Sequence, residues 1–145
     1  MSVKPIPEGY HSITPYLVVP GVAKLSDFLK QAFDAKEVDR MTTPDGMVMH
    51  AEVRIGDSRV MMGEAHGQWT AMPAMLYLYV EDCDAVYKRA LEAGATSVRE
   101  PADQFYGDRQ GGVKDPSGNQ WFIGTHIEDV APDEMERRAK AAMHA

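Results

Sequence analysis

Apolar and polar residues alternate with different periods along the chain, and these changes of period predict strands and helices. Residues 12–19 are apolar with partial alternation, which is typical of a strand, and Pro20-Gly21 ends this segment. Over residues 22–35 the apolar positions fall at helical spacing on one side, with polar residues on the other. We expect three further strands in this half of the chain, at residues 36–43, 47–55 and 58–64.

The second half of the chain repeats this organisation. Tyr16-Leu17-Val18-Val19 recurs as Tyr77-Leu78-Tyr79-Val80, and Val53-Arg54 recurs as Val113-Lys114. A helix with its apolar side between Ala85 and Ala95 is expected among strands at residues 74–80, 110–115 and 120–126 and a strand that begins with residues 96–99, which Pro101 interrupts or ends. Because a βαβββ unit cannot bury its sheet face alone, we expect the modules 12–64 and 74–128 to pack as one domain over residues 1–145.

A third helix is expected near the end of the chain, at residues 132–144. Its acidic residues (Asp133, Glu134, Glu136) precede its basic residues (Arg137, Arg138, Lys140), an order that complements the helix dipole. We expect this helix to serve in docking or dimerisation rather than in ligand binding.

Composition narrows the classes of function. The 145 residues carry a formal net charge of −7, which opposes binding to nucleic acids or to anionic membrane surfaces. No apolar stretch is long enough to span a membrane, and we expect no signal peptide. The single cysteine, Cys83, cannot form an internal disulfide and fits the reducing cytoplasm, where we expect the protein to act.

A resemblance to a known family lies in the second module. Tyr106-Gly107-Asp108-Arg109, followed by Gly112-Val113-Lys114-Asp115-Pro116-Ser117-Gly118-Asn119-Gln120-Trp121, resembles the glyoxalase/bleomycin-resistance/dioxygenase (vicinal oxygen chelate) superfamily, over roughly residues 10–128. Ile13-Thr14-Pro15-Tyr16-Leu17, His50-Ala51-Glu52 and Thr125-His126-Ile127-Glu128-Asp129 resemble its PhnB-like branch. The resemblance implies an α+β fold in which two βαβββ modules form a curved mixed sheet with a cleft.

The same resemblance implies the positions at which a metal site would lie. Most enzymes of that superfamily use a divalent metal whose His or Glu ligands come from the first and last strands of each module. Aligned through the repeat, those positions fall at Thr14, Met62, Met75 and Phe122. None is a good ligand for a catalytic divalent ion, so we expect neither a metal nor another cofactor, and no glyoxalase I or catechol dioxygenase activity.

A displaced site depends on the turn of the hairpin at Gly56. A three-residue loop, Gly56-Asp57-Ser58, would set His50 opposite Glu64, where the pair would be a candidate catalytic acid–base pair or a site for a divalent metal. A two-residue loop, Gly56-Asp57, would send His50 to the opposite face of the hairpin. The sequence leaves both arrangements open.

Aromatic and methionine side chains dominate the remaining candidates, which suits an apolar or planar ligand. Arg109 is either a clamp for a carboxylate or phosphate, or a partner of Asp108 or of a helix terminus. We expect His126 to be exposed or to cap the end of its strand. The full set expected to contact a ligand is Thr14, Tyr16, His50, Met62, Glu64, Met75, Tyr77, Arg109 and Phe122.

Two functions fit these observations. The favoured one is a homodimeric protein that binds a small, apolar or aromatic molecule in a cleft without the usual metal. The alternative is a lyase, isomerase or dioxygenase-type enzyme that uses His50 and Glu64 in a displaced site, with or without a divalent metal. Whether any reaction is catalysed is left open by the sequence.

Overall fold

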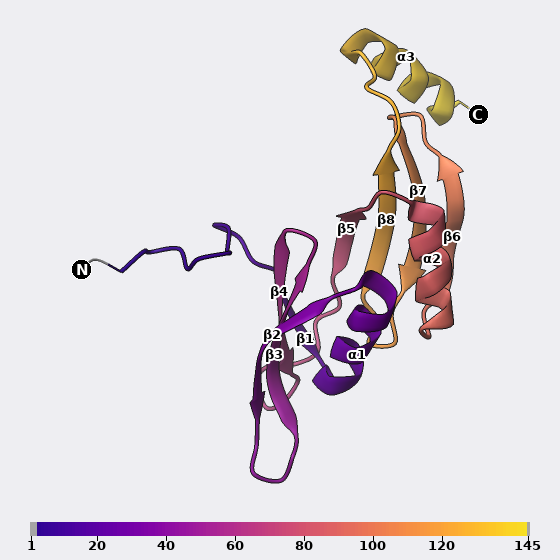
Figure 1. The fold of residues 1–145 in the computed structure, drawn as a ribbon. Helices are drawn as coiled ribbons and strands as arrows, with labels where there is room; N and C mark the ends of the chain where they lie inside the picture. Colours follow the sequence, from indigo (N-terminus) through magenta and orange to yellow (C-terminus); the bar gives the residue numbers. More distant parts are fainter. Residues whose placement is uncertain (1–2, 145) are drawn as a thin grey trace.

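The computed structural model describes residues 3–144 and contains two βαβββ modules followed by a C-terminal helix (Figure 1). The first module consists of β1 (Tyr16–Val19), α1 (Val22–Phe33), β2 (Lys36–Thr42), β3 (Val48–Ile55) and β4 (Ser58–Glu64). The second consists of β5 (Met75–Tyr79), α2 (Cys83–Glu92), β6 (Thr96–Asp103), β7 (Asp108–Lys114) and β8 (Gln120–His126), and α3 (Pro132–Met143) follows it.

The eight strands form two four-stranded mixed sheets with the same topology. Their orders are β1-β4-β3-β2 and β5-β8-β7-β6, and in each the first strand of the module pairs in parallel with the last. The predicted α+β fold of two βαβββ modules is therefore confirmed. Among the helices that the structure describes, none has the length and apolar character needed to cross a membrane.

The core lies where the two helices meet the sheets. The apolar face of α1 is fully buried at Val22, Leu25 and Leu29, and α1 packs against α2 between the two sheets (Figure 1). The ring of Phe33, from the end of α1, lies 4.9 Å from that of Trp121 on β8. One hydrophobic core therefore joins both modules and covers only the helix side of each sheet.

We call the side of each sheet opposite the helices its open face. Along β5 the alternation is plain: Met75, Tyr77 and Tyr79 are 69%, 41% and 60% exposed, while Leu76 and Leu78 pack against the core. On β1, Tyr16 is 52% exposed and its neighbour Leu17 only 1%. Tyrosine side chains on each open face are thus exposed to solvent and accessible to a ligand.

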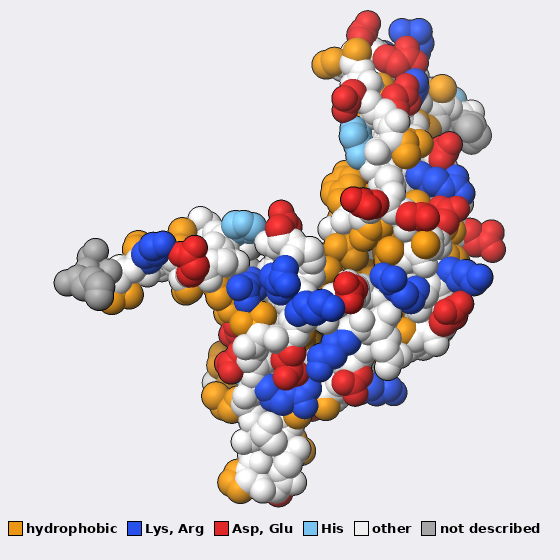
Figure 2. Space-filling view, in the orientation of Figure 1, with side chains coloured by type: hydrophobic (Ala, Val, Ile, Leu, Met, Phe, Trp, Pro, Cys, Tyr) orange, Lys and Arg blue, Asp and Glu red, His pale blue; other side chains and the backbone are white. Residues whose placement is uncertain are grey.

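The remaining segments lie outside the core. The N-terminal arm projects from the first module and carries apolar side chains along its length (Figure 2). Its attachment includes Arg59, whose guanidinium lies 5.1 Å from the centre of the Tyr10 ring. Helix α3 buries no residue, and Arg138 fastens it to Glu128 through two hydrogen bonds of 2.8 and 2.9 Å.

Strand β6 differs from its expected extent. It continues past Pro101 to Asp103, with register shifts against β7 between Ser97 and Arg99 and again between Arg99 and Ala102. Pro101 has no backbone N–H to donate, and a β-bulge accommodates such a residue without ending the strand. The bulges decide which side chains of β6 reach the open face.

Candidate functional site

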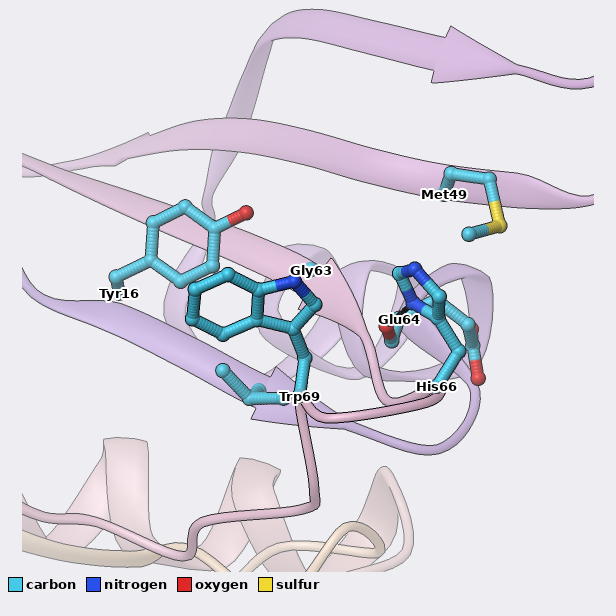
Figure 3. Close-up of a pocket in the computed structure, with 7 residues that line it drawn as sticks. Tyr16, Met49, Gly63, Glu64, His66 and Trp69 are labelled. Carbon is cyan, nitrogen blue, oxygen red and sulfur yellow. Dashed lines mark hydrogen bonds between the residues drawn. The ribbon is translucent and has the colours of Figure 1, made fainter.

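A cavity of about 380 Å³ lies on the open face of the first sheet (Figure 3). This volume is in the range of pockets that hold small molecules. Strands β1, β3 and β4 provide its floor, and the segment between the two modules provides one wall. Its lining residues are Tyr16, Val18, Met49, Gly63, Glu64, His66 and Trp69.

Two aromatic rings define one end of this pocket. Tyr16 lies across Gly63 of β4, where an added Cβ would be 2.6 Å from the tyrosine hydroxyl, so glycine is required for this approach. Trp69, in the segment after β4, is 59% exposed and lies beside Tyr16 in Figure 3. Planar apolar rings of this kind favour a flat or aromatic ligand.

A chain of hydrogen bonds runs from Tyr16 to the N-terminal arm. The His50 ring is 3.2 Å from the Tyr16 hydroxyl through Nδ1 and 3.1 Å from Glu52 Oε1 through Nε2. Tyr10 donates its hydroxyl to the other oxygen of Glu52. The hydrogen bond from Tyr10, followed by that from His50, outweighs burial and lowers the pKa of Glu52. Glu52 is therefore held ionised as an acceptor beside His50.

The hairpin between β3 and β4 has the two-residue loop. Ile55 pairs with Ser58, and His50 consequently pairs with Gly63 rather than with Glu64. The Glu64 carboxylate instead accepts the backbone N–H groups of Gly21 and Val22 at 2.8 and 3.0 Å. Glu64 thus caps the N-terminus of α1, and the convergence of His50 and Glu64 that a three-residue loop would have produced does not occur.

Met62 does not reach the ligand face. It is fully buried beneath α1, whereas its neighbour Met61 pairs with Tyr16 and lies on the open face. Tyr77 pairs with Phe122 in the second module, so Met61 is the structural equivalent of Phe122. The expectation for Met62 was wrong because aligning the last strands one residue out of step exchanges their two faces.

The open face of the second sheet is built around Asp108. This carboxylate is 3% exposed, and its Oδ2 accepts the hydroxyls of Tyr77 and Tyr79, each at 2.7 Å. Its Oδ1 lies 2.9 Å from Nδ1 of His126. Burial alone would raise the pKa of Asp108, but the hydrogen bonds from His126 and the two tyrosines outweigh it and lower the pKa. Burial, followed by the bond to Asp108, raises the pKa of Tyr77.

His126 is part of this Asp108 cluster. Its side chain is half exposed, as expected, and its Nε2 lies 2.7 Å from Asp129. The hydrogen bond to Asp108, followed by that to Asp129, raises the pKa of His126. Carboxylates on both sides of a histidine stabilise its protonated, charged form.

Arg109 points away from the open face. Its guanidinium contacts both oxygens of Asp84 at 2.7 and 3.0 Å and Asp103 at 3.0 Å. Asp84 lies in the first turn of α2, so the arginine fastens a sheet to a helix terminus. Of the two roles considered for Arg109, the geometry favours the partner of a helix terminus over the ligand clamp.

The other expected contacts lie in two places. Thr14 lines a second cavity of about 460 Å³, between the N-terminal arm and the first sheet, together with Tyr10 and Glu52. Met75 and Phe122 lie on the second open face. Trp69, Glu52 and Asp108 were not among the ligand contacts expected from the sequence, and neither was His66, which lines the first pocket.

The side chains of the open faces do not fit a divalent metal. Both ring nitrogens of His50 are engaged by Tyr16 and Glu52, and both oxygens of Asp108 are engaged by donors. The neighbouring phenols are poor ligands for Zn²⁺, Mn²⁺ or Fe²⁺, and the neighbouring carboxylates and imidazole are hydrogen-bonded to one another, Glu52 to His50 and Asp129 to His126. Within residues 3–144, no three His, Cys, Asp or Glu side chains are arranged to hold a metal ion.

Comparison with known proteins agrees with this fold. The sequence model of the Glyoxalase/Bleomycin resistance protein/Dioxygenase superfamily matches residues 9–123. An uncharacterized protein of Mycobacterium bovis is 38% identical over 136 residues, which cover 86% of this chain and 90% of the relative.

Solved structures also share the architecture. TioX from Micromonospora sp. ML1 aligns with a TM-score of 0.70 and 24% identity, over 81% of this chain and 99% of TioX. A gene product of Arabidopsis thaliana aligns with a TM-score of 0.65 and 22% identity, over 79% of this chain and 98% of its own. At these identities the likeness concerns the fold alone.

Proposed function

Because the chain belongs to the glyoxalase/bleomycin resistance protein/dioxygenase superfamily, we propose that it binds a small aromatic or apolar molecule on its open faces without a catalytic metal. The observation that supports this proposal is a tyrosine–glycine contact that occurs in both modules. Tyr16 lies over Gly63 and Tyr77 lies over Gly124, and both rings remain about half exposed on sheets whose other side packs against the helices. Contiguous exposed apolar surface is typical of binding sites, and Met75, Tyr77 and Tyr79 form such a row on β5.

A second copy of the chain is the partner that we propose. Neither open face covers the other within one chain, because the helices fill the space between the sheets. Met72, Met75 and Tyr79 are 68%, 69% and 60% exposed, and a second copy would bury them and enclose the ligand. The terminal segments, α3 or the arm, lie free to contact that copy (Figure 2).

An enzymatic function is the second candidate, and one contact favours it. His50 joins the exposed Tyr16 hydroxyl, on the wall of the pocket, to the ionised Glu52. A histidine oriented by a carboxylate is a common general base or acid, suited to lyase or isomerase chemistry. This arrangement takes the place of the pair formed with Glu64 in the hypothesis drawn from the sequence.

Two finer assignments accompany the proposal. We place the chain in the PhnB-like branch, on the strength of His50-Ala51-Glu52 and the segment around Tyr16. We also propose a cytoplasmic location, which suits the free thiol of Cys83, a side chain only 2% exposed.

Trp69 provides a direct test of binding. It lies in the pocket and is well exposed, whereas Trp121 is 2% exposed in the core, so an aromatic ligand should quench mainly Trp69. We expect saturable quenching by some members of a panel of small aromatic compounds, and about tenfold weaker binding for Tyr16→Ala. Val38→Ala, which shortens an exposed side chain on β2, is the control. If the wild type, Tyr16→Ala and Val38→Ala bind the aromatic compounds with equal affinity, this pocket is not the binding site.

A further inference from the structure

A row of paired residues crosses the open face of the second sheet. Tyr77 pairs with Phe122, Phe122 with Gly112, and Gly112 with Arg99, so the four positions share one face across all four strands. In the next row on the same face, Lys114 pairs with both Gln120 and Thr96. Arg99 and Lys114 are therefore neighbours beside the aromatic residues.

Among the described residues, neither of these cations has an acidic partner. Arg99 and Lys114 are exposed and form no ion pair with any residue between 3 and 144. Arg109, by contrast, is held by two carboxylates on the helix side. In a chain whose net charge is −7, two uncompensated cations on one sheet face form a local site of positive potential.

A buried amide orients Arg99. The Gln110 side chain is 5% exposed, its Oε1 accepts Nη1 of Arg99 at 3.0 Å, and its Nε2 donates to the Tyr106 hydroxyl at 2.8 Å. Because both ends of this amide are used, the amide cannot turn without losing a hydrogen bond. This hydrogen bond fixes the orientation of the guanidinium. Its other N–H groups have no hydrogen-bond partner among residues 3–144, so they can donate to an anion.

An aromatic ring lies in the same row as this cation, two strands away. The Phe122 ring covers Gly112, where an added Cβ would be 2.8 Å from it, so no side chain separates the ring from Arg99 across β7. Tyr77 continues the aromatic surface on the other side of Phe122. A flat ligand stacked on these rings would place a substituent at the guanidinium.

Asp108, the buried carboxylate of this face, lies toward its other end. Asp108 begins β7 and Lys114 ends it, which separates them by about 20 Å along the strand. The three donors described above already satisfy the Asp108 carboxylate. Lys114 therefore lies at one end of the face and the saturated Asp108 carboxylate at the other, and the Arg99 guanidinium is held at Gln110 between them.

We infer that Arg99 and Lys114 form an anion subsite, and that the ligand is a small aromatic molecule with a carboxylate or similar anionic group. This inference rests on the proposed function and names its ligand class. Arg99 would pair with the anion, Lys114 would add long-range attraction, and Gln110 would act as a positioning residue. The ring of the ligand would lie on Phe122 and Tyr77.

Isothermal titration of the full chain with 2-naphthoate and with 2-naphthamide tests the inference, since the two probes differ mainly in charge. We expect 2-naphthoate to bind about tenfold more tightly, and Arg99→Gln to remove that advantage while leaving 2-naphthamide unchanged. Arg54→Gln is the matched control, because Arg54 is an exposed arginine on β3 whose side chain donates a hydrogen bond to a backbone carbonyl and forms no ion pair within residues 3–144. The preference for 2-naphthoate should also weaken in high salt.

The outcomes separate the two levels of the proposal. Equal binding of both probes, with Arg99→Gln like the wild type, would overturn the anion subsite and leave aromatic binding in place. Loss of affinity for both probes in Arg99→Gln would also overturn it, because the effect would not depend on the anion. Failure of both probes to bind any of the proteins would contradict the anion subsite and aromatic binding together.

Discussion

Tyr77 lies directly over Gly124, so that a Cβ added to the glycine would come within 2.7 Å of the tyrosine hydroxyl. That hydroxyl is the one that donates to Asp108. The glycine is thus a condition for the whole Asp108 cluster, because any side chain at residue 124 would displace the ring that reaches the carboxylate.

The first prediction concerns this glycine. Gly124→Ala should lower the free energy of unfolding by about 1–3 kcal/mol, the usual range for inserting a methyl group into a filled space. In a Tyr77→Ala background the same substitution should cost much less, because the obstructing ring is gone. Urea denaturation of the four proteins measures both effects, and equal costs in the two backgrounds would show that the Tyr77–Gly124 contact is not the cause.

The second prediction concerns the buried carboxylate. Asp108→Asn should destabilise the protein by about 2–3 kcal/mol, since the amide has one acceptor oxygen for three donors. Asp103→Asn is the control, because that carboxylate is largely exposed and bonds only to Arg109. The two proteins can be compared by urea denaturation at neutral pH. Similar small losses would mean that Asp108 does not organise the second open face.

The third prediction is a pH dependence of stability. The pKa of His126 is raised above its ordinary value of 6.5, so protonation favours the folded state. Its contribution is fully present below about pH 6.5 and is lost as the pH rises through the folded pKa. The wild type should therefore lose stability between pH 6 and 9 relative to His126→Gln, measured by urea denaturation. Parallel profiles would contradict the interaction of His126 with Asp108.

The fourth prediction distinguishes the two roles considered for Glu64. As a cap of α1, Glu64→Ala should cost about 1 kcal/mol in unfolding free energy. His50→Ala should affect stability independently, so the double variant should show the sum of the two costs. A coupling well above about 0.5 kcal/mol in this cycle would support the direct pair, which the two-residue hairpin loop excludes here.

The repeat made the fold and part of the site predictable. Tyr16 and Tyr77 occupy matching places in the two halves of the sequence, and they occupy matching places over Gly63 and Gly124 in the structure. Local periodicity was sufficient here, because a strand with one buried face must send alternate residues to opposite sides. The same periodicity did not place Met62 correctly, because a shift of one residue in the alignment of the last strands assigned its side chain to the wrong face.

Other site residues depend on contacts that local patterns do not contain. Trp69 lies in an irregular segment without any periodicity, and Asp108 is defined by partners from β5 and β8. Arg99 would share the face of Ser97 if β6 alternated strictly, but the bulge between them places Arg99 on the open face. Ser97 instead bonds to Tyr87 of α2, on the helix side.

The most direct test of metal-independent aromatic binding is a titration of Trp69 fluorescence with the aromatic panel, carried out with and without a strong chelator. Saturable binding whose affinity is the same in chelator, and is weakened by Tyr16→Ala, is the predicted result. Binding that disappears in chelator and returns with an added divalent metal would contradict the proposal, as would the absence of saturable binding by any aromatic compound.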